Sequence, residues 1–151
     1  MNGARNKSLK ELVLEDPRPN TLTKTLTNAV AKYLYDKESF DEIDENELFY
    51  PINFVKSEDK PFQLYVFEGS TVTIATCATK SRVDFTSYSL KGSRLFLSEE
   101  VNSNGLTLTI IPADGVEIKF NVFVEADNYA EYDDAYEKRI VDIYNHLRQN
   151  I

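Results

Sequence analysis

The sequence predicts an α+β fold in which about seven antiparallel strands follow a helical N-terminal region and precede a long amphipathic C-terminal helix. The spacing of apolar residues changes from a helical period to a strand period near residue 48, and it becomes helical again after about residue 127. The 151 residues contain no visible linker or internal repeat. We therefore expect one domain, with a helical extension and acidic loop over 1–47 and a sheet plus helix over 48–151.

Two helices are predicted before the first strand. Ser8 and Glu11 have the spacing of a capping box, which indicates a short helix, although an extended segment fits nearly as well. From Asn20 to about Tyr35, apolar residues recur at helical spacing, which predicts a second helix. The acidic segment 36–47 is expected to form a loop or a loose helical turn.

Seven strand segments are predicted between the two helical regions. A proline places the first of them at a sheet edge, and Glu68–Gly69 is expected to form a tight turn between the second and the third. Phe85 and Tyr88 break the alternation of the fourth, which predicts a bulge at Thr86–Ser87. The predicted segments are 48–55, 62–67, 70–78, 82–90, 94–97, 105–111 and 116–124.

The C-terminal helix has the most regular pattern in the chain. It is expected to begin at Asp127 or Asn128 and to exceed twenty residues. Acidic residues are concentrated in its first turns and basic residues in its last turns, as the helix dipole favours. Its predicted apolar face consists of Tyr129, Tyr132, Tyr136, Ile140, Ile143, Leu147 and Ile151.

The charge of the chain argues against nucleic acid and anionic membranes as partners. The net charge is −8, and the segments 36–47 and 125–137 each carry −6, so the remainder carries +4. No apolar run is long enough to cross a bilayer. The single cysteine and the polar N-terminus predict a reducing, cytoplasmic location. A protein is the expected partner.

Catalytic and cofactor motifs are not visible, so we expect a protein that is not an enzyme and uses no cofactor or metal. Cys77 lies within a strand and His146 near the C-terminus, and these are expected to be a buried thiol and a solvated imidazole. The five glycines form no phosphate-binding loop. One histidine and one cysteine are too few for a zinc site.

The acidic segment has neither the glycine nor the alternation of a calcium-binding loop, so it is expected to be a solvated loop. A candidate acidic patch within it consists of Asp41, Glu42, Asp44 and Glu45.

Several strands also carry apolar residues opposite their main apolar face. The favoured interpretation is that a helix covers these residues, and the alternative is a surface that binds a partner. This candidate partner surface consists of Tyr65, Phe67, Phe96, Ile111 and Phe123.

The segments RVDFTSYSL and GLTLTIIPADGVEIKF, followed by a closing helix, make the region from about Phe49 to Ile151 resemble the pleckstrin-homology-like (PH-like) superfamily, including its bacterial domains. The resemblance implies a bacterial or phage protein in which two nearly orthogonal sheets form a sandwich or barrel closed by the helix. It also implies a non-catalytic module that binds lipid headgroups, peptides or proteins. Lipid-binding members use basic residues around the first hairpin. Here that loop is either the segment 56–61, where acidic residues lie between Lys56 and Lys60, or Glu68–Gly69–Ser70, which has no basic residue, so phosphoinositide binding is not expected.

Two other interpretations remain open. The helix-grip fold of START and Bet v 1-like proteins also ends in a long helix, and it would make the chain a carrier of a small apolar ligand. The two strongly acidic segments also fit an inhibitor that occupies the basic cleft of a nucleic-acid-binding protein.

Overall fold

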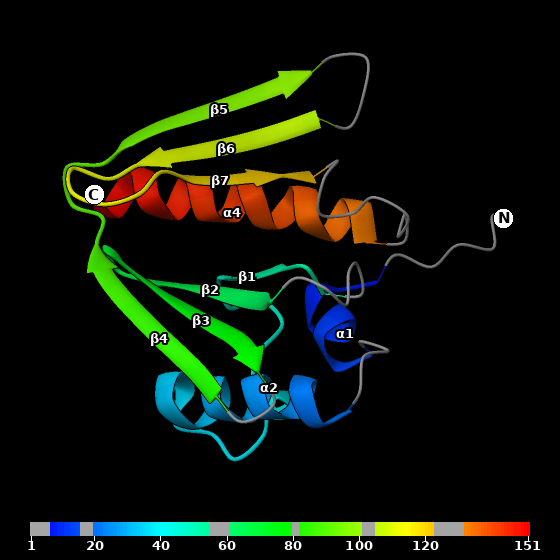
Figure 1. Ribbon diagram of the computed structural model, residues 1–151. Helices are drawn as coiled ribbons and strands as arrows, with labels where there is room; N and C mark the ends of the chain where they lie inside the picture. The colour runs from blue at the N-terminus through cyan, green and yellow to red at the C-terminus, as the bar shows by residue number, and fades with distance from the viewer. Residues whose placement is uncertain (1–6, 16–19, 55–60, 80–81, 101–104, 123–131) are drawn as a thin grey trace, which may run out of the picture.

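The computed structural model describes residues 7–15, 20–54, 61–79, 82–100, 105–122 and 132–151, and it has the predicted α+β architecture. The strands form two antiparallel sheets (Figure 1). The four-stranded sheet contains β1 (Phe49–Ile52), β2 (Phe62–Glu68), β3 (Thr71–Thr79) and β4 (Arg82–Ser89) in that order. The three-stranded sheet contains β5 (Arg94–Glu100), β6 (Gly105–Ile111) and β7 (Ile118–Asn121). The helices are α1 (Leu9–Leu14), α2 (Asn20–Tyr35), the 3-10 turn η1 (Phe40–Glu42) and α4 (Asp133–Asn150).

The two sheets do not close into a barrel, which corrects the barrel form of the expected fold. No strand of one sheet pairs with a strand of the other within the described ranges. The change of sheet occurs between β4 and β5, where Ser93 donates a backbone hydrogen bond to the Leu90 carbonyl at 3.0 Å. Gly92 lies in this turn at φ +78°, a conformation that other residues rarely adopt. The sheets meet near this turn and diverge away from it (Figure 1).

Helices separate the protein into layers. α2 lies on the face of the four-stranded sheet that points away from the three-stranded sheet, and α4 lies between the two sheets (Figure 1). α4 contacts β5 and β6 on one side. On the other side, the Tyr136 hydroxyl donates a hydrogen bond to the Pro51 carbonyl of β1 at 2.9 Å. The C-terminal helix therefore joins the sheets through both side-chain packing and hydrogen bonds.

The centre of the core is an aromatic cluster around Phe120 of β7. Tyr50 of β1 stacks on the Phe120 ring with centroids 3.9 Å apart. Tyr65 and Phe67 of β2 meet the same ring edge-on at 5.2 and 6.0 Å. Alternate residues of β2, including Leu64, are buried on the opposite face, which is the face of the sheet on which α2 lies. β2 is therefore apolar on both faces because both faces are covered.

The expected bulge at Thr86–Ser87 is wrong. Thr86 and Ser87 pair regularly with β3, and the register shifts between Cys77 and Thr79 instead. Side chains of β4 alternate regularly between the two faces. The sequence suggested a break because apolar residues of this strand lie on both faces of the sheet. Phe85 contacts Tyr33 of α2 at 6.0 Å, and Tyr88 lies on the other face.

Both N-terminal helical predictions are confirmed. Ser8 and Glu11 form the capping box of α1, and Ser39 and Glu42 form a second one around η1 within the acidic segment. α4 has 18 residues, and the predicted start near Asp127 lies outside the described residues. No described helix is long and apolar enough to span a membrane.

Candidate interaction surface

The three-stranded sheet has one face against α4 and the core and the other face directed outward. The cross-strand row Leu97, Leu108 and Phe120 lies on the inner side, where Leu108 and Phe120 are buried. Successive side chains alternate between faces, so the neighbouring residues point outward. We call this set the outer face: Arg94, Phe96, Ser98, Glu100, Gly105, Thr107, Thr109, Ile111, Lys119 and Asn121.

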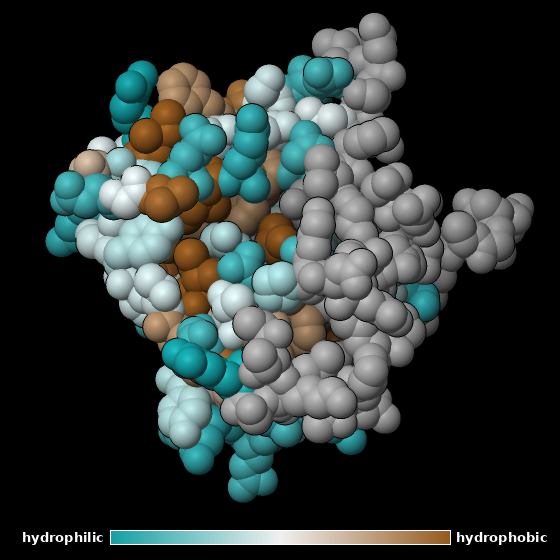
Figure 2. Space-filling model, in the orientation of Figure 1, coloured by the Kyte–Doolittle hydropathy of each residue, from teal (hydrophilic) through white to brown (hydrophobic). Residues whose placement is uncertain are grey.

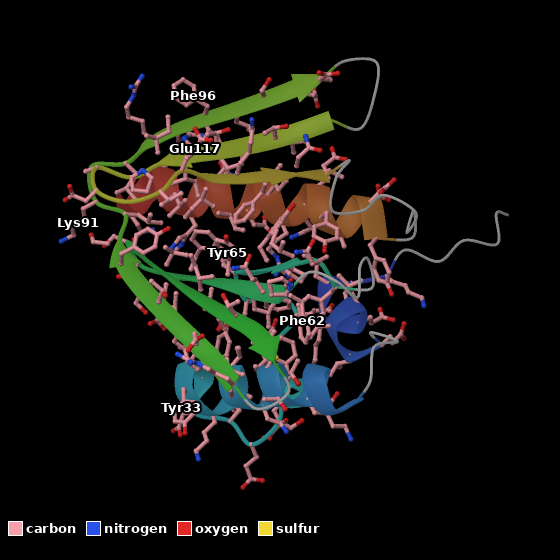
Figure 3. All side chains as sticks on the ribbon, viewed as in Figure 1. Tyr33, Phe62, Tyr65, Lys91, Phe96 and Glu117 are labelled. Atoms are coloured by element: carbon pink, nitrogen blue, oxygen red, sulfur yellow. The ribbon has the colours of Figure 1, made fainter. Side chains whose placement is uncertain are left out.

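The outer face combines an exposed aromatic side chain with a polar depression. Phe96 projects from β5 away from α4 and is 48% exposed (Figure 3). The Arg94 guanidinium lies 5.4 Å from the centre of its ring. The depression beside them has a volume of about 550 Å³ and is lined by Ser98, Glu100, Gly105, Thr107, Thr109, Lys119 and Asn121. Apolar surface near β5 and β6 is interrupted by hydrophilic side chains (Figure 2).

The polar part of the outer face is partly organised by its own contacts. Asn121 donates a side-chain hydrogen bond to the Thr107 hydroxyl across β6 and β7. The outer face also presents the hydroxyls of Ser98 and Thr109 and the ammonium of Lys119, which can bond a polar partner surface. An open surface of this kind can recognise another macromolecule through an aromatic and arginine anchor inside a polar rim.

The structure does not place the described residues of the candidate partner surface on one face of the protein. Phe96 and Ile111 lie on the outer face as diagonal neighbours, because Ile111 pairs with Arg94. Phe67 is buried, and Tyr65 is half-buried and points between the sheets (Figure 3). The other sheet, through Phe120, packs against both side chains. Phe123 lies outside the described residues.

The candidate acidic patch is exposed, but its groups are used locally. The Glu42 and Asp44 carboxylates accept backbone hydrogen bonds from Ser39 and Asn46 at 3.1 and 2.7 Å. The Asp41 and Glu45 carbonyls accept bonds from Lys10 and Arg139. These contacts attach the segment to α1 and α4. Within the described ranges, no three acidic, histidine or cysteine side chains are grouped so that they could hold a metal ion.

Arg139 is a buried charge that the sequence analysis missed. It is 6% exposed, and its guanidinium donates to the Phe49 and Glu45 carbonyls and lies 4.5 Å from the Phe49 ring. Burial lowers the pKa of this guanidinium, and nearby acids, led by Asp142, act in the opposite direction. Arg139 follows Tyr136 by three residues and precedes Ile143 by four, so it lies on the apolar face of α4. This spacing is the feature of the sequence from which its burial could have been predicted.

An open pocket of about 290 Å³ adjoins Arg139. Three basic and three acidic side chains line it, so it has no net preference for a cation or an anion. Its charged lining residues are Lys7, Glu45, Asp134, Lys138, Arg139 and Asp142. Because the Arg139 guanidinium is bonded to two backbone carbonyls, its role is to hold β1 and the acidic segment against α4.

The two reactive residues of the chain have structural surroundings. Cys77 is buried, as predicted. His146 is half-buried, and its Nε2 lies 2.8 Å from the Gly69 carbonyl. This contact ties the β2–β3 hairpin to α4.

No protein family, curated protein or solved structure matches the chain. The function is therefore inferred from the geometry of the outer face.

Tyr35 is expected to limit stability in alkaline solution. Its hydroxyl is buried without a hydrogen-bond partner among the described residues. Burial, with Glu47 acting in the same direction, raises the pKa of Tyr35 well above its ordinary value. Above about pH 10 the unfolded chain loses this proton and the folded chain keeps it, so stability falls as pH rises. Tyr35→Phe removes this contribution. Between neutral pH and about pH 11, the free energy of unfolding measured by chemical denaturation should therefore fall less for the variant than for the wild type.

At neutral pH, Tyr136→Phe is expected to lower the free energy of unfolding. This substitution removes the bond to the Pro51 carbonyl and leaves a buried acceptor, which costs about 1–2 kcal/mol of unfolding free energy. Tyr35→Phe is the matched control, because it deletes a hydroxyl that has no described partner and should be neutral or slightly stabilising. Equal losses from both substitutions in urea denaturation at neutral pH would contradict the assigned contacts.

Proposed function

We propose that this chain is a non-enzymatic protein-binding module of PH-like type and that it binds its partner through the outer face of the three-stranded sheet. The observation that carries this proposal is the exposed pair of Phe96 and Arg94 on a sheet face that no described helix covers. Aromatic and arginine side chains are the residue types most enriched where binding energy is concentrated.

The energetics of the outer face suit a protein partner. Burying the exposed half of the Phe96 ring contributes about 1 kcal/mol, and a partner group over Arg94 adds a charge-assisted hydrogen bond. The half-buried Thr107, Thr109 and Asn121 supply a polar rim beside this anchor. The charges of the outer face are mixed, which supports a protein partner rather than a nucleic acid or an anionic membrane.

The PH-like resemblance also supports this proposal. It is based on the order of strands and closing helix, and members of that superfamily are mostly non-catalytic binding modules. The surroundings of Cys77 and His146 agree with such a role, since the thiol is buried and the imidazole contacts a backbone carbonyl.

Site-specific photo-cross-linking in cells tests the proposal. A photoreactive phenylalanine analogue at position 96 is expected to give a discrete adduct with another protein. The same analogue at Val116, which is 80% exposed, is the matched control for accessibility and should not give that adduct. Arg94→Ala and Thr109→Lys, each combined with the analogue at position 96, should remove the adduct, because they delete the anchor and fill the rim.

Three outcomes would contradict this function. They are no adduct at position 96, identical adducts from positions 96 and 116, and an adduct that both outer-face substitutions leave unchanged. Turnover of a small substrate by the purified protein would contradict the non-enzymatic part of the proposal. An adduct of the chain with itself would report self-association rather than a separate partner.

A further inference from the structure

We propose that two copies of this chain associate through β5, pairing antiparallel to join their three-stranded sheets into one six-stranded sheet. β5 is an edge strand, since the sheet order is β5-β6-β7 and only β6 pairs with it in the described structure. Six of its seven residues are exposed, including Phe96 and Leu97 at 48% and 38%. A long edge strand with unpaired backbone groups and exposed apolar side chains is a template for further strand pairing.

The sequence of β5 is complementary to itself in one antiparallel register. When Leu97 lies opposite Leu97 of the second copy, all seven residues pair, and Arg94 lies opposite Glu100 at both ends. A twofold axis perpendicular to the sheet produces this register and keeps both outer faces on the same side. Opposite charges directly across an antiparallel pair stabilise the pairing. A shift of two residues in either direction loses both Arg94–Glu100 pairs and shortens the overlap.

The remaining strand edges are less suitable. The Phe49 and Pro51 carbonyls of β1 accept bonds from α4, so that edge is in use. β7 has only four residues. β4 is also an exposed edge, but it has eight residues, and its two longest twofold antiparallel registers put Arg82 opposite Tyr88 or Val83 opposite Ser89, with no charge complementarity. The favoured occupant of the β5 edge is therefore a second copy of the chain.

This association does not rest on the proposed function, because the β5 edge can pair whether or not another protein binds the outer face. In the dimer, the outer faces form one continuous surface across the twofold axis. Phe96 of each copy then lies beside Ser98 of the other, and the two Leu97 side chains meet on the inner side.

Sedimentation analysis with a charge exchange tests the pairing. In about 0.15 M salt and at up to about 1 mM protein, the wild type is expected to show a reversible dimer. At that concentration, half of the chains are in dimers even when the dissociation constant is about 1 mM. Arg94→Glu or Glu100→Arg alone replaces two attractive pairs by two repulsive ones, so each should weaken association at least about fivefold. The double variant R94E/E100R should recover an association constant within about twofold of the wild type. Glu38→Arg, an equal charge change at an exposed position of the acidic segment, is the control and should behave as the wild type.

Cysteine cross-linking tests the register directly. Opposed residues in an antiparallel pair have Cα atoms about 4.5–5.5 Å apart, within the range for a disulfide. Leu97→Cys is therefore expected to form a covalent dimer on mild oxidation, and Thr86→Cys on the exposed β4 edge is expected not to. Circular dichroism verifies that each variant is folded.

Any of four results would overturn the proposal. They are a monomer at every concentration, a dimer that the single charge substitutions leave unchanged, a double variant no better than the single variants, and equal cross-linking of Leu97→Cys and Thr86→Cys. These results leave the adduct between position 96 and another protein unaffected, whereas an adduct of the chain with itself reports the dimer, so failure of the dimer and failure of the proposed function are distinguishable.

Discussion

Phe120→Ala is expected to lower the free energy of unfolding by about 3–5 kcal/mol, as in other large-to-small aromatic substitutions in cores. Phe120 is 1% exposed and contacts the rings of Tyr50, Tyr65 and Phe67. Alanine removes the common neighbour of three aromatic side chains at the meeting point of the two sheets. The cavity cannot close unless the sheets move together, so much of the lost packing energy is not recovered. Urea denaturation followed by circular dichroism measures the change.

Phe96→Ala is the matched control for this prediction. The same side chain is deleted from the same sheet, but from its outer face, where it is 48% exposed. The stability change should therefore stay within about 0.5 kcal/mol. The control is measured at a protein concentration low enough to keep the chain monomeric. Similar losses for the two substitutions would show that Phe120 is not the centre of the core.

Arg139→Met is expected to lower the free energy of unfolding by about 2–4 kcal/mol. Each bond from the charged guanidinium contributes about 1.5–3 kcal/mol, and methionine leaves the Phe49 and Glu45 carbonyls without these donors. Part of the loss is recovered because methionine does not carry the desolvation cost of a buried charge. Amide hydrogen exchange should show the largest increase in β1 and the acidic segment, since Arg139 holds both against α4.

Lys138→Met is the control for Arg139→Met, because it removes a neighbouring positive charge from the same helix. The Lys138 side chain is 69% exposed and forms an exposed ion pair with Asp142 at 2.7 Å. Exposed pairs of this kind contribute about 0–1 kcal/mol, so the variant should remain close to the wild type. A large effect of Lys138→Met, or a small effect of Arg139→Met, would contradict the assignment of Arg139 as the residue that joins these segments.

The local structure could be predicted from the sequence because local physical chemistry determines it. The capping box at Ser8 and Glu11 and the turn at Gly69 are formed by neighbouring residues. The helical apolar face of α4 is likewise a repeat within one segment, and its described members are buried, apart from the half-buried Ile151. Strand alternation similarly placed the boundaries of β2 and β6 within one residue of those observed.

The arrangement of the elements could not be predicted in the same way. Alternation shows that Tyr65 and Phe67 lie on the second face of β2, but not whether a helix, another sheet or a partner covers them. The burial of Arg139 depends on the Phe49 and Glu45 carbonyls, which are 90 and 94 residues away in the chain. Of the residues on the outer face, the sequence predicted only Phe96 and Ile111 as part of a partner surface. The polar residues of this face have the pattern of an ordinary solvated strand face.

The position of α4 between the sheets has a consequence for synthesis of the protein on the ribosome. The seven described strands leave the ribosome before α4, and the hairpins of each sheet can form from near neighbours in the chain. The contacts that join the sheets span much longer stretches, as Tyr136 and Pro51 are 85 residues apart. Until α4 emerges, the apolar inner faces of both sheets lack the element that packs between them. The nascent chain is therefore more exposed to aggregation and chaperone binding before α4 is made than after it.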